Sequence, residues 1–165
     1  MESDLQSRRR VSIQNRQEAC PVAPGDLEHW RAIGECALAL IEEQRLARAP
    51  RPSCLGIVLV DDKAIAVLHG DFLDDPTPTD VMTFPLGDLG EIVVSVETAR
   101  RQAAEFGQET VREIALYVVH GILHLCGYDD NTWRGQCEMN SLQERLLSEA
   151  ESLVNGSGTS QDSVD

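Results

Sequence analysis

Apolar residues recur along this chain with two periods, which predict short strands alternating with longer helices. Aliphatic and β-branched runs predict four strands, at residues 11–15, 53–60, 81–84 and 90–96. Apolar residues three to four positions apart predict five helices: one opened by Pro24-Gly25-Asp26 and ending before Pro50, a short one after Asp61-Asp62, and three at 97–106, 109–125 and 136–153.

Polar and helix-breaking residues set the expected boundaries of these elements. We expect Asp26 to cap the first helix and Asp61-Asp62 to cap the second, because a carboxylate at this position accepts a hydrogen bond from a free backbone N–H group. Pro85 is expected to end the third strand. The strand at 53–60 is apolar throughout, so we expect it to be buried on both faces of the sheet.

Four short strands and five helices predict a single α+β domain, in which a small mixed four-stranded sheet packs against the helices. A chain of 165 residues is long enough to bury a hydrophobic core of its own. We expect residues 1–154 to form this domain. Residues 155–165 are rich in Gly, Ser and Asp, and they are expected to form a disordered tail.

The predicted helix at 109–125 carries two of the four histidines, His120 and His124, near its end. Residues four positions apart share one face of a helix, so the two imidazoles can converge on one metal ion. Gly127 can end the helix in a left-handed conformation and turn the chain back, which brings Asp130 towards the same point. The spacing H-x3-H-x5-D therefore predicts a metal site with three protein ligands, at the end of a buried helix.

Two histidines at this spacing also occur by chance on exposed helices, where they bind nothing. Here the flanking residues 114–119, 122, 123 and 125 are largely apolar, and burying two imidazoles without a common partner costs free energy. Two histidines and a carboxylate suit one Zn²⁺ with an open position for water, although the same set also serves non-haem iron. Cys126 points to a different face of the helix, and we expect it to be a small buried hydrophobe.

Composition restricts the class of protein. The net charge of −14 repels nucleic acid at long range, so an RNA substrate would need local basic groups, the metal or a partner to attract it. The alternative explanation of this charge is that an acidic surface keeps the protein soluble. Five widely spaced cysteines without a CxxC pair predict reduced thiols. The polar N-terminus and the lack of a long apolar run predict a cytoplasmic protein with no membrane span.

The spacing of the histidines, the glycine and the acid is also that of one class of zinc peptidases. Those enzymes place a glutamate directly after the first histidine as general base, whereas this chain has Gly121 there. A peptidase is therefore the minor interpretation.

The sequence candidates for a base or for a group that orients a ligand are Asp80, Glu91 and Asp129. Each of them is equally well explained as a surface acid or a cap.

Three blocks of the chain resemble the YbeY family. HGILHLCGYD at 120–129 resembles the family signature HGxLHLxGYDH, PTDVMTFP at 78–85 resembles PTDVLSFP, and LGEIVVS at 89–95 resembles LGDIVIS. The resemblance implies a zinc-dependent endoribonuclease that acts on single strands, matures the 3′ end of 16S rRNA and serves ribosome biogenesis and quality control. Its implied partners are rRNA precursors and ribosomal particles or small-subunit proteins, with no DNA and no membrane.

The chain departs from the family pattern at two places. The third metal histidine of the family falls on Asp130, which the resemblance makes the third ligand beside His120 and His124. The family segment LNxxYR falls on residues 68–73, so that its Asn becomes His69 and its Arg, thought to handle the phosphate backbone, becomes Leu73. His69 is either a group near the metal or a histidine with a local hydrogen bond.

Three arginines, Arg100, Arg101 and Arg112, are either substitute phosphate contacts or parts of solvated helix faces. Because the family Arg is missing and the chain is acidic, a second hypothesis stands beside the nuclease. In it, the chain is a binding factor in ribosome assembly, and its metal is mainly structural.

Overall fold

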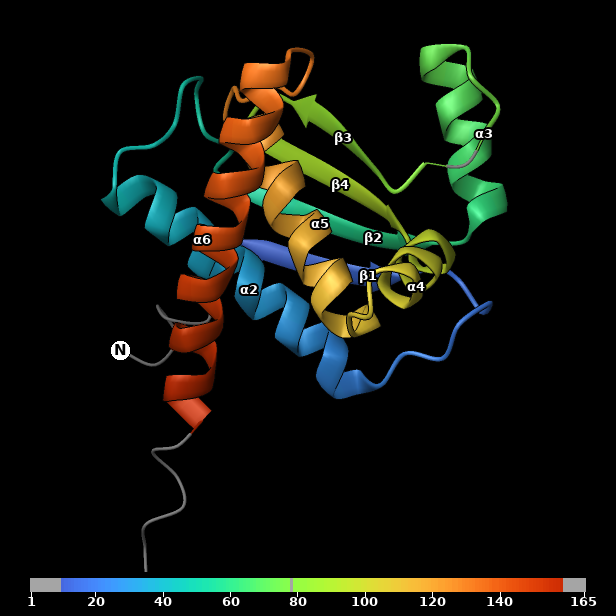
Figure 1. Ribbon diagram of the computed structural model, residues 1–165, viewed down its shortest axis with the longest axis horizontal. Helices are drawn as coiled ribbons and strands as arrows, with labels where there is room; N and C mark the ends of the chain where they lie inside the picture. Colours follow the sequence, from blue (N-terminus) through green and yellow to red (C-terminus); the bar gives the residue numbers. More distant parts are fainter. Residues whose placement is uncertain (1–9, 78, 159–165) are drawn as a thin grey trace, which may run out of the picture.

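The computed structural model describes residues 10–77 and 79–158, and Pro78 of the second family-like block lies outside them. The described part forms four strands and five helices around one sheet (Figure 1). In chain order they are β1 (Val11–Asn15), α2 (Pro24–Glu43), β2 (Cys54–Val60), α3 (Asp62–Leu73), β3 (Val81–Leu86), β4 (Leu89–Ser95), α4 (Val96–Glu105), α5 (Thr110–Leu125) and α6 (Trp133–Gly158). The predicted α+β domain with a small mixed sheet is thus confirmed.

The sheet has the strand order β1-β2-β4-β3. β1, β2 and β4 are parallel, and β3 is an antiparallel edge strand that pairs with β4 through a tight turn at Gly87. The expectation that Pro85 ends β3 is wrong, because the strand continues through Pro85 to Leu86. An edge strand tolerates proline, since one side of the strand needs no N–H group for pairing.

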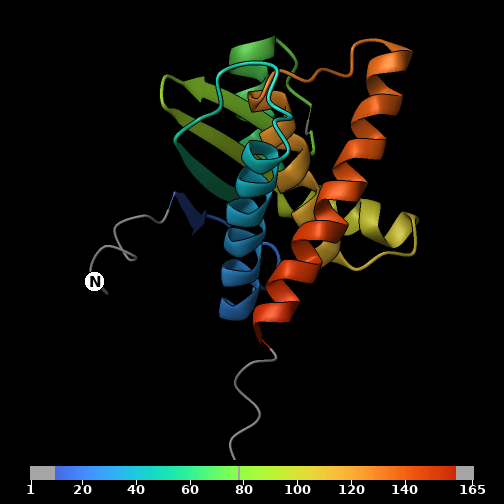
Figure 2. The same cartoon turned by 90° about the vertical axis from the view of Figure 1, so that its left-hand side faces the viewer.

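Helices cover both faces of the sheet, but unequally. On one face, α2 and α5 pack against the strands, and α6 lies over α2 and α5 as a further layer (Figure 2). The main core lies here, and it includes the inward side chains of β2, Leu55, Ile57 and Leu59. On the other face, α3 and the β2 residue Val60 contribute to a smaller cluster. The predicted burial of β2 on both faces holds only towards the end of the strand, because Cys54 at its start is exposed.

The two predicted helix caps have different outcomes. Asp61 caps α3 by accepting a hydrogen bond from the backbone N–H of Ala64 at 2.8 Å, as expected. Asp26 does not cap α2, because that helix begins two residues earlier at Pro24, after Ala23. Proline suits the first helical position, where its missing N–H group would have no partner within the helix.

The last helix is longer than its apolar pattern predicted. α6 extends from Trp133 to Gly158, so residues 155–158, expected in a disordered tail, are helical. Residues 159–165 lie outside the described residues. None of the helices in the described ranges combines the length and hydropathy needed to cross a bilayer.

α5 lies unusually close to the sheet. A Cβ atom at Gly121 would lie 2.9–3.1 Å from the side-chain carbons of Ile92 on β4, which is closer than carbon atoms pack. The absence of a side chain at Gly121 therefore allows the helix to approach β4. This approach holds the histidines of α5 beside the edge strand β3, where the candidate site forms.

Candidate metal centre

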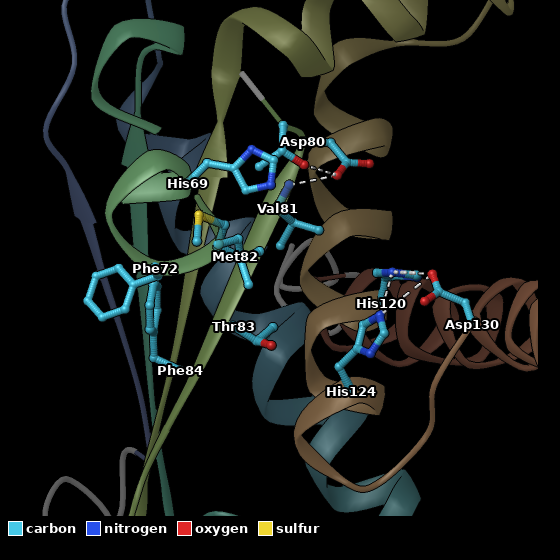
Figure 3. Close-up of a pocket in the computed structure, with 12 residues that line it drawn as sticks. His69, Phe72, Asp80, Val81, Met82, Thr83, Phe84, His120, His124 and Asp130 are labelled. Atoms are coloured by element: carbon cyan, nitrogen blue, oxygen red, sulfur yellow. Dashed lines mark hydrogen bonds and ion pairs between the residues drawn. The ribbon is translucent and has the colours of Figure 1, made fainter. Parts of the chain in front are cut away.

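His120, His124 and Asp130 converge on one point, as the sequence predicted. The Nε2 atoms of the two histidines lie 3.0 Å apart, and each lies 3.8 Å from Asp130 Oδ2 (Figure 3). All three side chains are partly buried, and in the described part of the chain they form the group whose donor atoms lie close enough to hold a metal ion. Two imidazole nitrogens and a carboxylate oxygen are ligands that suit Zn²⁺.

The chain turn after α5 brings Asp130 to the histidines. Gly127 adopts φ +98°, so it ends the helix in a conformation that favours glycine. The backbone N–H groups of Arg48 and Ala49 donate to the carbonyl of Cys126 at 2.8 and 2.9 Å. The hydroxyl of Tyr128 donates to the carbonyl of Leu46 at 2.8 Å. These bonds tie the turn to the segment after α2 and thereby set the path to Asp130.

A residue of α6 orients the first histidine. His120 Nδ1 donates a hydrogen bond to the side-chain oxygen of Gln143 at 2.7 Å, which leaves the Nε2 lone pair facing His124 and Asp130. A partner on the second ring nitrogen is usual for histidines that bind metal. Sequence reasoning missed Gln143. The sequence did offer one indication of its role: Gln143 lies one helical turn after the apolar Met139, so it borders the face of the last helix that packs on the domain.

The electrostatics of His124 also fit metal binding. Burial lowers its pKa, and the neighbouring His120 lowers it further, against the opposing effects of Asp130, the Tyr128 backbone and Asp129. The imidazole is therefore neutral at neutral pH, and a neutral imidazole carries the free electron pair that a metal needs. The donor set, its convergence and the neutral ring of His124 thus fit one bound ion.

The three residues lie at one end of a cleft with a volume of about 470 Å³. The edge strand β3 runs through the cleft wall, and α3 forms the wall on the far side of that strand (Figure 3). The remaining lining residues are His69, Phe72, Leu73, Thr79, Asp80, Val81, Met82, Thr83 and Phe84. Lys and Arg are absent from the described lining.

The three sequence candidates for a base have different locations. Asp80 lines the cleft and accepts a hydrogen bond from the backbone N–H of Val81 at 2.8 Å. Asp129 is exposed outside the three-residue group and accepts from the backbone N–H of Asn131. Glu91 pairs with Phe84 and, by the alternation of strand β4, points to the face opposite Ile92 and α5. Of the three, the structure brings only Asp80 into the cleft.

The other candidates are explained by local contacts. His69 lines the cleft, but it lies outside the three-residue group and hydrogen bonds to the carbonyl of Thr77. Arg101 pairs with Asp62, and Arg112 pairs with acidic residues of α6. Arg100 lines a separate pocket of about 260 Å³. Cys126 is fully buried, and burial raises the pKa of its thiol to about 11, as expected of a small core residue.

A family model described as Endoribonuclease YbeY matches residues 12–151 of this chain. The chain belongs to the YbeY family. A curated relative from Synechococcus sp. (strain CC9605), named Endoribonuclease YbeY, is 39% identical over 133 residues, which cover 73% of this chain and 80% of the relative. Another of the same name, from Moorella thermoacetica, is 37% identical over 152 residues, covering 82% of this chain and 94% of the relative.

A solved structure has the same fold as this YbeY-family chain. The solution structure of TM1509 from Thermotoga maritima matches with a TM-score of 0.56 and 27% sequence identity. The match covers 92% of this chain and the whole of the Thermotoga protein. It agrees with the small mixed sheet and five helices described above.

Proposed function

We propose that this YbeY-family chain is a metal-dependent endoribonuclease that holds one Zn²⁺ with His120, His124 and Asp130. The observation that carries the proposal is the convergence of the three donor atoms at one end of an open cleft. The curated relatives named Endoribonuclease YbeY support the reaction class. The finer role that we propose is cleavage of single-stranded rRNA precursor at the 3′ end of 16S rRNA, in the cytoplasm, together with ribosomal particles or small-subunit proteins.

The residues of the cleft divide the chemistry among them. When bound, the zinc ion would polarise the scissile phosphodiester and offset the negative charge that develops on it. Gln143 holds the ring of His120 in the tautomer that directs Nε2 to the site. Asp80 is the lining carboxylate besides Asp130, and we propose that it accepts the proton of the hydroxyl group that attacks phosphorus. The bond from phosphorus to the leaving ester oxygen then breaks, and that oxygen takes a proton from solvent.

The metal requirement is tested by elemental analysis of purified protein. The wild type should contain one zinc per chain, Asp130→Ala should lose it, and Asp130→His should retain it. The neighbouring Asp129→Asn is the matched control, because this exposed residue lies outside the three-residue group. A wild type that binds no metal would contradict the proposal.

Cleavage is tested on single-stranded RNA with the same variants. His124→Ala should abolish cleavage, and Asp80→Asn should lower kcat by about 100-fold or more while the zinc content stays unchanged. Asparagine keeps the oxygen that accepts from the Val81 N–H group, so this substitution preserves the local backbone. Activity that persists in His124→Ala would belong to a contaminating nuclease and would remove the catalytic proposal.

One observation favours a second candidate function. The described cleft lining lacks Lys and Arg, and the chain carries a net charge of −14, so long-range attraction of RNA is weak. If the chain is a ribosome-assembly factor with a mainly structural metal, the wild type should co-sediment with ribosomal particles and cleave no RNA.

A zinc peptidase is disfavoured, because the position directly after His120 lacks the glutamate that serves such enzymes as general base. The residue there is Gly121, which packs against Ile92.

A further inference from the structure

The wall of the cleft opposite the metal centre carries an exposed aromatic ring. Phe72 lies at the end of α3 with 63% of its surface exposed, although it lines the cleft. Its ring makes an edge-on contact with Phe84 of β3, with centroids 5.1 Å apart and planes at 68° (Figure 3). The contact orients the Phe72 ring while most of its surface stays open to a ligand.

One turn earlier on the same helix, His69 is held in a defined orientation. Its Nδ1 donates to the carbonyl of Thr77 at 2.9 Å, and Asp75 Oδ2 lies 4.0 Å from the same nitrogen. Thr77 is itself fixed, because its N–H and hydroxyl groups both donate to Asp75 Oδ1. In this tautomer Nε2 is a hydrogen-bond acceptor, and no residue of the described ranges donates to it.

His69 and Phe72 both line the cleft and lie one helical turn apart on α3. Residues three positions apart on a helix are neighbours along its surface. We propose that α3 binds a nucleotide that flanks the cleavage position: Phe72 stacks on the base, and His69 Nε2 accepts a hydrogen bond from the ribose 2′-hydroxyl. This inference rests on the proposed function, since it names how that cleft recognises RNA.

The charge of the cleft explains why recognition of this kind is needed. The carboxylates of Asp80 and Asp130 line it, and Lys and Arg are absent from the described lining, so phosphate groups find few partners apart from a bound metal. Stacking is short-ranged and insensitive to charge, and every base has a face that can stack. A 2′-hydroxyl contact adds the means to distinguish RNA from DNA.

Binding of AMP and dAMP, measured by NMR titration of the zinc-loaded full chain, tests the inference. Neither molecule has a phosphodiester bond to cleave, and they differ only in the 2′-hydroxyl. The wild type should bind AMP about 2- to 10-fold more tightly than dAMP, which is the effect of one hydrogen bond. His69→Leu should abolish this preference and leave the affinity for dAMP unchanged.

Phe72→Ala should weaken binding of both nucleotides alike, by about fivefold or more, and Phe72→Trp should restore it. Phe106→Ala is the matched control, because Phe106 is 69% exposed at the end of α4 and lies outside the cleft. His29→Leu on α2 is the control for the histidine. Both controls should bind as the wild type does.

The outcomes separate this inference from the proposed nuclease activity. A wild type that binds neither nucleotide, a Phe72→Ala variant that binds normally, or a His69→Leu variant that still prefers AMP would overturn the inference, even if the wild type cleaves RNA. A wild type that prefers AMP through these two residues but cleaves no RNA would refute the nuclease and leave the inference standing. Thermal unfolding of each variant verifies that the fold is intact.

Discussion

His120 on α5 and Gln143 on α6 are joined by a 2.7 Å hydrogen bond that decides which ring nitrogen of the histidine faces His124 and Asp130. The bond links the helix that carries both histidines to the outermost helix of the domain. It makes α6 part of the candidate metal centre, although α6 contributes none of the three converging donor atoms.

Gln143→Leu removes the acceptor for the His120 Nδ1–H group and frees the ring to rotate. Zinc affinity, measured by competition with a chelator of known affinity, should fall about 10- to 100-fold. Gln143→Glu keeps an acceptor oxygen and should retain most of the affinity. Gln136→Leu changes an exposed glutamine of the same helix and should have no effect. Equal affinities in Gln143→Leu and wild type would show that Gln143 does not orient the ligand.

Gly121→Ala tests the close approach of α5 to the sheet. The added methyl group would lie 2.9–3.1 Å from Ile92, and such overpacking costs about 1–3 kcal/mol. The higher helix propensity of alanine returns up to about 1 kcal/mol, so we expect a net loss of about 1–2 kcal/mol in the free energy of unfolding. Denaturant titration measures it.

The double variant Gly121→Ala/Ile92→Val should be more stable than the sum of the single effects predicts, because valine vacates part of the contested space. Gly156→Ala on α6 is the control, since a Cβ atom there meets nothing within 4 Å. That substitution should be neutral or slightly stabilising. A Gly121→Ala variant as stable as Gly156→Ala would contradict the tight contact.

Gly127→Ala should damage both stability and metal binding. The residue has φ +98°, and a Cβ atom would lie 2.9 Å from the backbone nitrogen of Ala49. Strain and overlap together should cost about 2–4 kcal/mol of unfolding free energy, and zinc affinity should fall because the turn that leads to Asp130 is displaced. Gly107→Ala shares a positive φ of +65° but has open space around it. It should lose about 1 kcal/mol and bind zinc normally.

Asp62 should make the stability of the fold depend on pH. Burial raises its pKa, but hydrogen bonds from Arg101, Ser95 and Thr98 outweigh the burial and lower the pKa overall. A carboxyl group with a lowered folded-state pKa stabilises the fold above its unfolded-state pKa of about 4, and this contribution is lost as pH falls through the folded-state value.

Wild type should therefore exceed Asp62→Asn in unfolding free energy at pH 7, and the difference should shrink steadily below about pH 4. Urea unfolding at a series of pH values measures it. Asp71→Asn, at an exposed position on the same helix, should change the unfolding free energy at pH 7 by less than about 0.5 kcal/mol. If the difference between wild type and Asp62→Asn grew as the pH fell, the folded-state pKa of Asp62 would not be lowered.

Features that depend on neighbouring residues could be predicted from the sequence. The period of the apolar residues located the nine elements of the described part of the chain, and the H-x3-H-x5-D spacing located the three donor atoms. His120 and His124 share a helix face through backbone geometry alone, and Gly127 permits the turn to Asp130 through its own φ angle. Helix and strand ends were less predictable. Proline can precede a helix or occupy its first position, as Pro24 does, and it can end a strand or lie within an edge strand, as Pro85 does.

Contacts between distant segments could not be predicted in the same way. Glu91 looked as suitable a base as Asp80, but the pleat of β4 places it on the face opposite α5. Gln143 reaches His120 only because α6 folds back over α5. The sequence by itself determined which three residues converge as candidate metal ligands, since their geometry is local. Only the tertiary structure decided what surrounds them, because packing of α3, β3 and α6 sets which side chains share the cleft.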